Sequence, residues 1–350
     1  MSDLKELRDL IWRSPSSHEK INLLEEAIRL ADSLGDVEEA FDLRDDLISL
    51  CTEYGQFMKA IVAFSWCLAR VEEGKFKFDY NMSWNYGAVM GRAAAFDSIS
   101  LEQLNKLHSD FHRHMKTLGA TDQVHYSNML RSAVILRSPE MAKEAKQNML
   151  LHKKDSHSDC SACLQNTLAQ FEQHFGTYER MKELAEPLFQ GKMSCNMIPL
   201  RTYGFLVNTL HRGGDVEMAK QASEKGIRLI GNKSGFLEQI GLHLIYLAET
   251  DIRKAVALFK KTLKWALNNT EVPWGIFHFH VGAYAIFARG KKRKMLLDSS
   301  YPLYEETGEY NSEKLAAYHL AEAEKLAERF DKRNRHGWAS RFLEAEKARI

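Results

Sequence analysis

The sequence predicts an all-α fold, an α-solenoid of antiparallel helix hairpins stacked into a right-handed superhelix. Apolar residues recur at three- and four-residue steps along nearly the whole chain, which is the period of an amphipathic helix. The connections between these stretches are about two to eight residues long, so consecutive helices should be antiparallel neighbours. A third observation is a helix boundary that recurs along the chain.

The recurring boundary stands near both ends of the sequence. Residues 35–40 read Gly-Asp-Val-Glu-Glu-Ala and residues 214–219 read Gly-Asp-Val-Glu-Met-Ala, with looser copies at 55–60 and 250–255. In each copy a small or polar residue ends one helix, and the next helix begins at once with Ala on its buried turn. Such repetition is typical of stacked helical hairpins.

Each expected helix follows from an apolar stripe, a cap or a helix breaker. Residues 17–34, for example, place Ile21, Leu24 and Ile28 on one face, and Ser100 with Gln103 predicts a capping box. No period-two alternation bounded by turn residues is present, so we expect no strands. The expected helices span residues 17–34, 36–54, 56–72, 83–96, 101–118, 121–137, 139–152, 159–175, 177–190, 199–212, 215–230, 235–249, 251–268, 274–289, 293–307, 311–333 and 336–349.

Charge and periodicity divide the chain into three parts. Residues 1–50 contain six Lys/Arg against thirteen Asp/Glu. We therefore expect an acidic helical segment over residues 1–80, continuous with the solenoid. Helical repeats should fill residues 81–333, and residues 334–350 should form a capping helix.

Whole-chain composition excludes several classes of protein. The sequence has no run of about eighteen uncharged apolar residues, so we expect no membrane span. Its start lacks the basic and apolar regions of a signal peptide, and five Cys is an odd number, so a cytoplasmic location is expected. The net charge of +1 does not favour nucleic acid as a partner. Phosphate-loop, dinucleotide and Gly-x-Ser-x-Gly motifs are absent, so we expect no enzyme and no cofactor.

Residues 202–222 form an amphipathic helix, a Gly-containing turn and a second helix with Ala219 and Ala222 at its crossing point, and residues 241–259 repeat the arrangement. This pattern resembles the tetratricopeptide and pentatricopeptide helical-repeat proteins, with degenerate units over residues 17–333. At the level of fold, the chain is also similar to bacterial peptide-sensing regulators, although residues 1–80 contain no evident DNA-binding motif. The resemblance implies a non-enzymatic scaffold or regulator that binds a peptide or partner protein, and it leaves a homodimer open.

In such a scaffold the first helix of each unit lines a concave groove. Polar and aromatic side chains on those helices are the candidate peptide contacts. The candidates are Asn85, Tyr86, Tyr126, Asn128, Tyr203, Asn208, His243 and Tyr246.

The alternative is a zinc-containing helical sensor or enzyme. His157, Cys160 and Cys163 could supply three zinc ligands, with His152 or His174 as the fourth. The competing interpretation is structural, because Ser158-Asp159 is a good helix N-cap that would place both cysteines in the first turn as small apolar residues.

Three further segments have two interpretations each. The basic run 289–294, Arg-Gly-Lys-Lys-Arg-Lys, could bind an acidic surface or solvate a helix end. The aromatic segment 272–284 favours a buried helix over a groove lining. His108 and His112 have metal-ligand spacing, but they favour a solvent-flanking pair because no Glu follows the first His.

Overall fold

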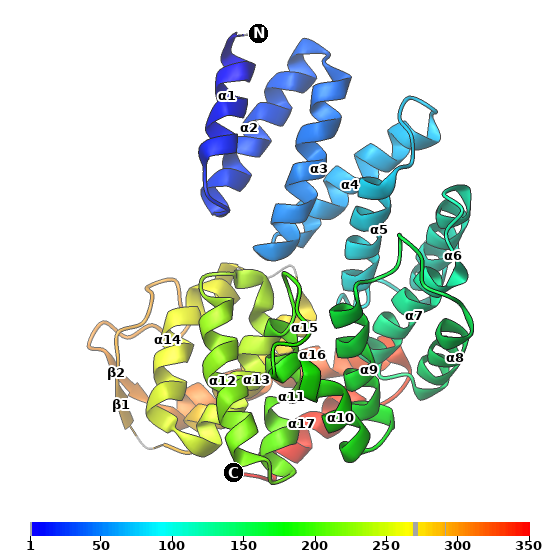
Figure 1. The fold of residues 1–350 in the computed structure, drawn as a ribbon. Coiled ribbons are helices and arrows are strands. Elements are labelled where there is room, and N and C mark those ends of the chain that lie inside the picture. The colour runs from blue at the N-terminus through cyan, green and yellow to red at the C-terminus, as the bar shows by residue number, and fades with distance from the viewer. Residues whose placement is uncertain (1, 269–271, 291) are drawn as a thin grey trace.

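The computed structural model describes residues 2–268, 272–290 and 292–350, and over these residues the chain is all-α, as predicted (Figure 1). Within them we find 17 α-helices, one short 3-10 helix and one two-stranded sheet. The elements are α1 (Ser2–Arg13), α2 (His18–Leu34), α3 (Val37–Glu53), α4 (Phe57–Glu72), α5 (Tyr80–Ala93), α6 (Leu101–Thr117), α7 (Asp122–Leu136), α8 (Pro139–Leu151), α9 (Ser161–Phe175), α10 (Tyr178–Phe189), α11 (Leu200–Arg212), α12 (Val216–Ile230), η1 (Ser234–Phe236), α13 (Leu237–Thr250), α14 (Ile252–Asn268), α15 (Pro273–Phe287), β1 (Lys292–Lys294), β2 (Glu309–Asn311), α16 (Ser312–Asn334) and α17 (Trp338–Lys347).

The recurring boundary is confirmed as a helix end followed directly by a helix start. Gly35 ends α2 with a φ of 69°, a left-handed conformation that glycine adopts without strain. The Asp36 carboxylate then accepts a hydrogen bond from the Glu39 N–H at 3.1 Å and caps α3. Gly214, with a φ of 90°, stands at the corresponding place before α12. In all four copies the alanine one turn later is buried; these residues are Ala40, Ala60, Ala219 and Ala255.

The structure corrects the predicted helices at two places. Helix α1 was not predicted, although Leu4 and Ile11 lie on one face of it and are buried. The helix expected over 293–307 is wrong, as is the expectation of no strands. Pro302 interrupts that segment, and Asp298 forms a turn by accepting a hydrogen bond from the Ser300 N–H at 2.9 Å. Instead, β1 and β2 pair antiparallel, and Tyr310 of β2 is buried.

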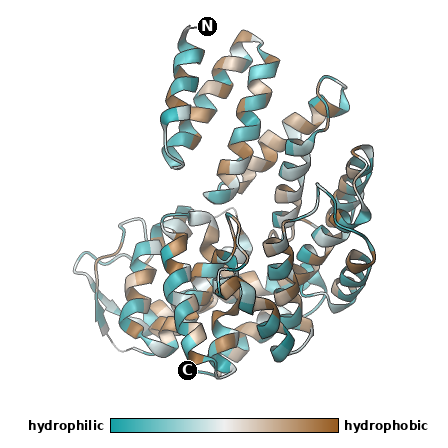
Figure 2. Ribbon diagram, in the orientation of Figure 1, coloured by the Kyte–Doolittle hydropathy of each residue, from teal (hydrophilic) through white to brown (hydrophobic). Residues whose placement is uncertain are grey.

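The helices pack as a continuous row. Each odd-numbered helix from α3 to α15 contacts the next odd-numbered helix and also the even-numbered helix that follows it in the chain. Hydropathy alternates around most of the helices, as expected if one face of each lies against its neighbours (Figure 2). No helix among the described residues is both long enough and apolar enough to cross a lipid bilayer.

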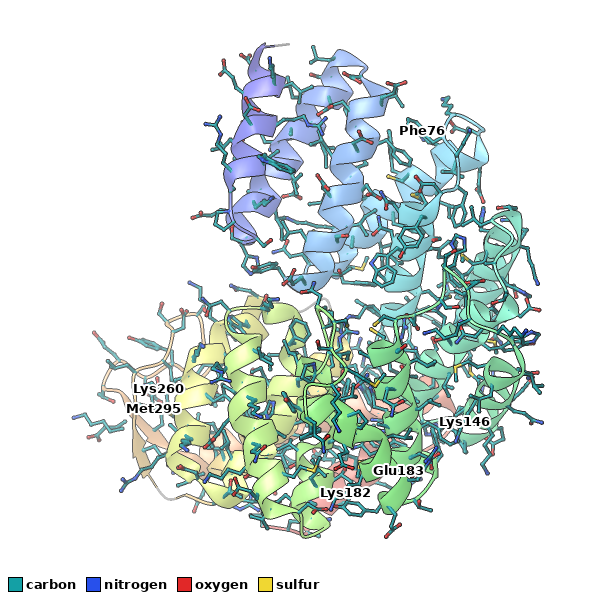
Figure 3. All side chains as sticks on the ribbon, viewed as in Figure 1. Phe76, Lys146, Lys182, Glu183, Lys260 and Met295 are labelled. Carbon is teal, nitrogen blue, oxygen red and sulfur yellow. The ribbon has the colours of Figure 1, made fainter. Side chains whose placement is uncertain are left out.

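Ion pairs join even-numbered helices to neighbouring helices. Lys146 of α8 contacts Glu172 of α9 at 2.6 Å, and Lys182 of α10 contacts Asp215, the N-cap of α12, at the same distance. Figure 3 shows both lysines on their helices. These pairs are partly exposed, so they contribute little to stability and mainly fix which faces meet.

The closest packing in the row lies between α13 and α15. A Cβ atom added at Gly241 would lie 2.3 Å from the backbone carbonyl carbon of His278, and one at Gly282 would lie 2.7 Å from the carbonyl oxygen of Gly241. The two helix backbones are therefore in direct contact. Helix α15 is buried almost all round, so the aromatic segment 272–284 belongs to the core, as favoured from the sequence.

Contacts between distant parts of the chain hold the ends of the row together. Arg333 of α16 donates to the carbonyl oxygens of Ala94, Phe96 and Ile99, at 2.6, 2.7 and 2.9 Å. The hydroxyl of Ser234 in η1 donates to the carbonyl of Tyr54 just beyond α3, at 2.7 Å. Segments late in the chain therefore bond to the loops that follow α3 and α5.

We expect Gly241→Ala to destabilise the protein by about 1–3 kcal/mol or more, because the new methyl group meets backbone atoms that cannot rotate away. Urea unfolding measures the change. Gly87→Ala is the matched control, since its Cβ would meet only the Asn128 side chain at 3.7 Å and alanine favours a helix. Equal stability of the two variants would contradict the close contact.

Several histidines are buried among apolar side chains. Burial lowers the pKa of His108, His125 and His280 to about 4, and that of His243 and His278 to about 3. His108 donates to or accepts from the Ser132 hydroxyl at 3.0 Å, so the solvent-flanking position expected for it is wrong.

These histidines predict acid sensitivity. Between about pH 6.5 and pH 4 the unfolded chain binds protons that the folded chain excludes, so stability is full above pH 6.5 and falls as the pH falls. Asp45, Asp46 and Glu238 have the opposite effect, because burial raises the pKa of each carboxyl, that of Asp45 to about 6, but the five histidines outnumber them. We expect the free energy of unfolding to drop by roughly 2 kcal/mol per buried histidine from pH 6.5 to 5. An unchanged or rising value in urea titrations would contradict this.

Candidate functional site

The candidate site is a cleft among the N-terminal and middle helices; a second cleft, bordered by α7, α8 and α17, has a similar volume of about 930 Å³. The candidate site has a volume of about 840 Å³, and its walls come mainly from α3, α5, α7 and α9, with α1 and α2 at one rim. The lining residues on α5 follow one face of the helix at three- and four-residue steps; they are Tyr80, Ser83, Trp84, Gly87, Ala88, Gly91 and Arg92. We call this space the central cleft; its size is that of a ligand site.

Besides Arg8 of α1, which pairs with Glu39, three arginines line the central cleft: Arg92 on α5, Arg131 on α7 and Arg201 at the start of α11. All three are half-buried. Arg131 is paired, because its Nη2 lies 2.6 Å from the carboxylate of Asp159, which also accepts from the Ser127 hydroxyl at 2.7 Å.

The other two arginines have no such partner. Within the described ranges, no carboxylate lies at ion-pair distance from Arg92 or Arg201. Arg92 makes only a long hydrogen bond, 3.4 Å, to the carbonyl of Gly235, and Arg201 lies 5.9 Å from the ring of Phe236. Burial, with the charges of Arg92 and Arg131, lowers the pKa of Arg201 to about 9. An unpaired cation in this setting is costly, so it indicates a site for an anion.

Glu238 of α13 interacts electrostatically with Arg92 and Arg201 at longer range. It is buried, and burial raises its pKa although Arg137 and Arg92 oppose that effect. Its carboxylate accepts a hydrogen bond from the indole Nε1 of Trp274 at 2.9 Å, rather than from an arginine. The guanidinium groups of Arg92 and Arg201 therefore retain N–H donors that can bind a ligand in the cleft.

Aromatic side chains line the cleft near its N-terminal rim. Trp12 of α1 is 88% exposed, and Tyr80 and Trp84 of α5 are each 53% exposed. Large aromatic side chains exposed beside a cavity are typical of binding surfaces, where they supply apolar contact area. The central cleft thus combines exposed aromatic side chains with half-buried arginines, and its lining also contains the acids Asp9, Asp46, Glu53 and Asp159.

Of the eight contact residues expected from the sequence, only Asn128 is among the described residues that line the cleft. Asn85 is buried and bonded to Asp45, and Asn208 donates to the Leu242 carbonyl at 2.8 Å. Tyr86, Tyr203, His243 and Tyr246 are buried in the packed interior, and Tyr126 stacks on His152. Neighbouring positions on the same helices, such as Trp84 and Arg131, face the cleft instead.

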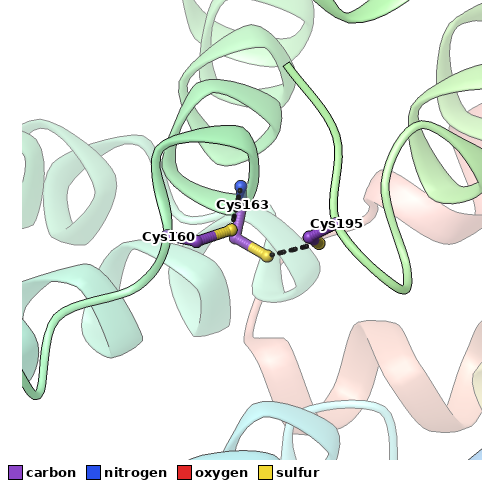
Figure 4. A group of neighbouring side chains, drawn as sticks. All are labelled: Cys160, Cys163 and Cys195. Carbon is purple, nitrogen blue, oxygen red and sulfur yellow. Dashed lines mark hydrogen bonds between the residues drawn. The ribbon is translucent and has the colours of Figure 1, made fainter. Parts of the chain in front are cut away.

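A group of three thiols forms part of the cleft wall (Figure 4). The Sγ atoms of Cys160, Cys163 and Cys195 all lie within 4.8 Å of one another, and those of Cys163 and Cys195 are 3.4 Å apart. Cys160 is the N-cap of α9, where its sulfur accepts from the Cys163 N–H at 3.4 Å. The structure therefore brings two of the three expected metal ligands together, adds Cys195 and leaves His157 outside the group.

His157 has a different setting. It also lines the cleft, but its ring lies 6.0 Å from that of Tyr80, and its backbone N–H donates to Asp155 at 2.8 Å. His174, a proposed fourth ligand, is packed against Trp338 and Phe175. His152 stacks on Tyr126.

The basic run 289–294 lies away from the cleft lining. Arg289 donates to the carbonyl of Arg349 at 3.0 Å, and residues 292–294 form β1. Lys291 lies outside the described residues. The described part of the run therefore forms strand β1 and donates a hydrogen bond to the C-terminal end of the chain.

Comparison with known proteins gives no match: no family model matches the chain, and neither a curated protein nor a solved structure is similar to it.

We expect Asp159→Ala to lower the free energy of unfolding by about 1.5–3 kcal/mol, because Arg131 and the Ser127 hydroxyl lose their shared acceptor. Thermal or urea unfolding measures the loss. The control is Glu183→Ala on α10, which removes an exposed partner of Arg180 and should cost less than about 1 kcal/mol. A loss no larger than the control would contradict the role given to Asp159.

Proposed function

We propose that the protein is a tetratricopeptide-like binding scaffold or regulator whose central cleft binds an extended peptide or a partner's terminal segment. In this proposal the odd-numbered helices are the inner layer of a right-handed solenoid, and the cleft is its concave surface. The continuous contacts along α3, α5, α7, α9 and α11 support that arrangement.

The observation that carries the proposal is the unpaired state of Arg92 and Arg201 inside the cleft. A guanidinium group matches a carboxylate with two parallel hydrogen bonds, and both arginines lack a carboxylate among the residues that the structure describes. We infer that the ligand supplies one, either an acidic side chain or a C-terminal carboxylate. Trp12, Tyr80 and Trp84 would hold the apolar part of the same ligand.

A peptide fits these features better than a nucleic acid does. Nucleic-acid binding needs a basic track that follows many phosphates, whereas these cations lie together in one cleft of a chain with net charge +1. A cleft of about 840 Å³ encloses a short segment rather than a duplex. Asn128, which also lines the cleft, could hold the backbone of an extended segment through its side-chain amide.

The proposal is tested with a library of short peptides in which each acidic peptide is paired with its amide counterpart. Trp12 and Trp84 line the cleft, so intrinsic fluorescence reports occupancy. We expect micromolar or tighter binding that favours the acidic member. Equal binding of acids and amides, or no binding across the library, would refute the anionic site.

We expect Arg201→Gln to weaken acidic-peptide binding by about 10- to 100-fold, the effect of losing one charge-assisted hydrogen bond. The same substitution should leave stability unchanged or raised, because it removes a cation that the folded state disfavours. Arg180→Gln on α10 is the control, since that arginine pairs with Glu183 outside the cleft. A destabilised Arg201→Gln with unchanged binding would assign Arg201 a structural role instead.

A further inference from the structure

The three thiols of the cleft wall come from two separate parts of the chain. Cys160 and Cys163 lie at the start of α9, and Cys195 lies in the loop before α11, 32 residues after Cys163. Figure 4 shows the loop passing the start of α9, with a contact drawn between the sulfurs of Cys163 and Cys195. The fold, rather than local spacing, therefore brings the three sulfurs together.

The separation of these sulfurs suits a metal ion. Tetrahedral zinc with Zn–S bonds of about 2.3 Å places its thiolates roughly 3.8 Å apart. Here the closest pair is 3.4 Å apart, and no pair exceeds 4.8 Å, so the required spacing lies within the observed range. A disulfide needs about 2.05 Å, which none of these sulfurs approaches.

We propose that Cys160, Cys163 and Cys195 bind one zinc ion through three thiolates, with the fourth coordination position open to the central cleft. Among the described residues, no His, Asp or Glu joins the group as a fourth ligand. All three cysteines line the cleft, and Cys160 is exposed, so a metal ion can enter from solvent. Three protein ligands with one open position is the arrangement of zinc sites that bind water or a ligand.

The charges around the group suit an anionic metal complex. Zinc displaces three thiol protons to solvent and no electrons are transferred, so the zinc–trithiolate unit carries one negative charge. Arg131 and Arg201 are close enough to Cys163 to interact with it electrostatically. Asp159 pairs with Arg131, so of these two arginines Arg201 is the one without a carboxylate partner among the described residues.

Zinc binding is tested on the reduced full-length protein with Zn²⁺ alone, by competition with a coloured chelator. We expect one equivalent per chain, and Co²⁺ in its place should give the thiolate charge-transfer and tetrahedral absorption bands of a sulfur-rich site. Because protons are released, affinity should increase with pH. No stoichiometric metal, or Co²⁺ spectra without thiolate bands, would overturn the proposal.

Matched variants test which residues bind the metal. Cys195→Ser and Cys160→Ser should each weaken zinc binding at least tenfold, and serine at position 160 remains a good N-cap, so that variant should fold normally. His157→Ala is the control and should keep the wild-type affinity. Loss of binding in His157→Ala with retention in Cys195→Ser would overturn the assignment, as would a disulfide in the freshly purified protein.

The zinc site does not depend on the peptide proposal. Zn²⁺ titration needs no peptide, and Cys51 and Cys67 are buried in the core and unchanged in every variant. Failure of acidic peptides to bind would therefore leave the metal result intact, and absence of metal would leave the role of the arginines intact.

Discussion

Side-by-side packing of the odd-numbered helices is the constraint on which the rest of the structure depends. The row requires small side chains wherever two helix backbones meet, and the requirement is greatest at Gly241 and Gly282, where α13 touches α15. Close-packed interiors tolerate little change of volume at such contacts. Because each helix is fixed against the next, the cleft-facing positions of α5, α7 and α9 come into register along one surface.

Contacts from segments late in the chain support the helices of the cleft wall. Arg333 satisfies three backbone carbonyls beyond α5, and Ser234 bonds beside the end of α3, so late helices brace the early ones that form the cleft wall. An arginine satisfies several acceptors at once because its guanidinium carries five donors. Half-buried charged groups lower the stability of the folded state. In the proposed function, a ligand bound in the cleft offsets this free-energy cost for Arg92 and Arg201.

Much of the fold could be predicted from the sequence, because amphipathic periodicity and caps are local. Gly35 with Asp36 marks a real helix boundary, and nearly all expected helices are present within a few residues. The prediction of a helix over 293–307 is wrong for a physical reason: it gave more weight to apolar residues at helical spacing than to Asp298 and Pro302, which favour a turn. The buried Tyr310 shows that tertiary packing holds the β1–β2 hairpin.

The site was harder to predict, because it depends on how far each helix is rotated against its neighbours. A shift of two positions along α5 exchanges Tyr86, which is buried, for Trp84, which faces the cleft. Cys195 could not be assigned to the thiol group from spacing, since a loop 32 residues away supplies it. The one available signal was the Gly87, Ala88 and Gly91 stripe on α5, where small residues on a helix face leave room for a ligand.

The central claim is that the cations of the cleft exist to receive an anionic group of a bound peptide. A crystal structure of the protein with the tightest-binding acidic peptide tests it most directly. We predict a peptide carboxylate within hydrogen-bond distance, about 3 Å, of the guanidinium groups of Arg92 or Arg201. A peptide bound on the outer helices, or one whose acidic group points away from both arginines into solvent, would contradict the account.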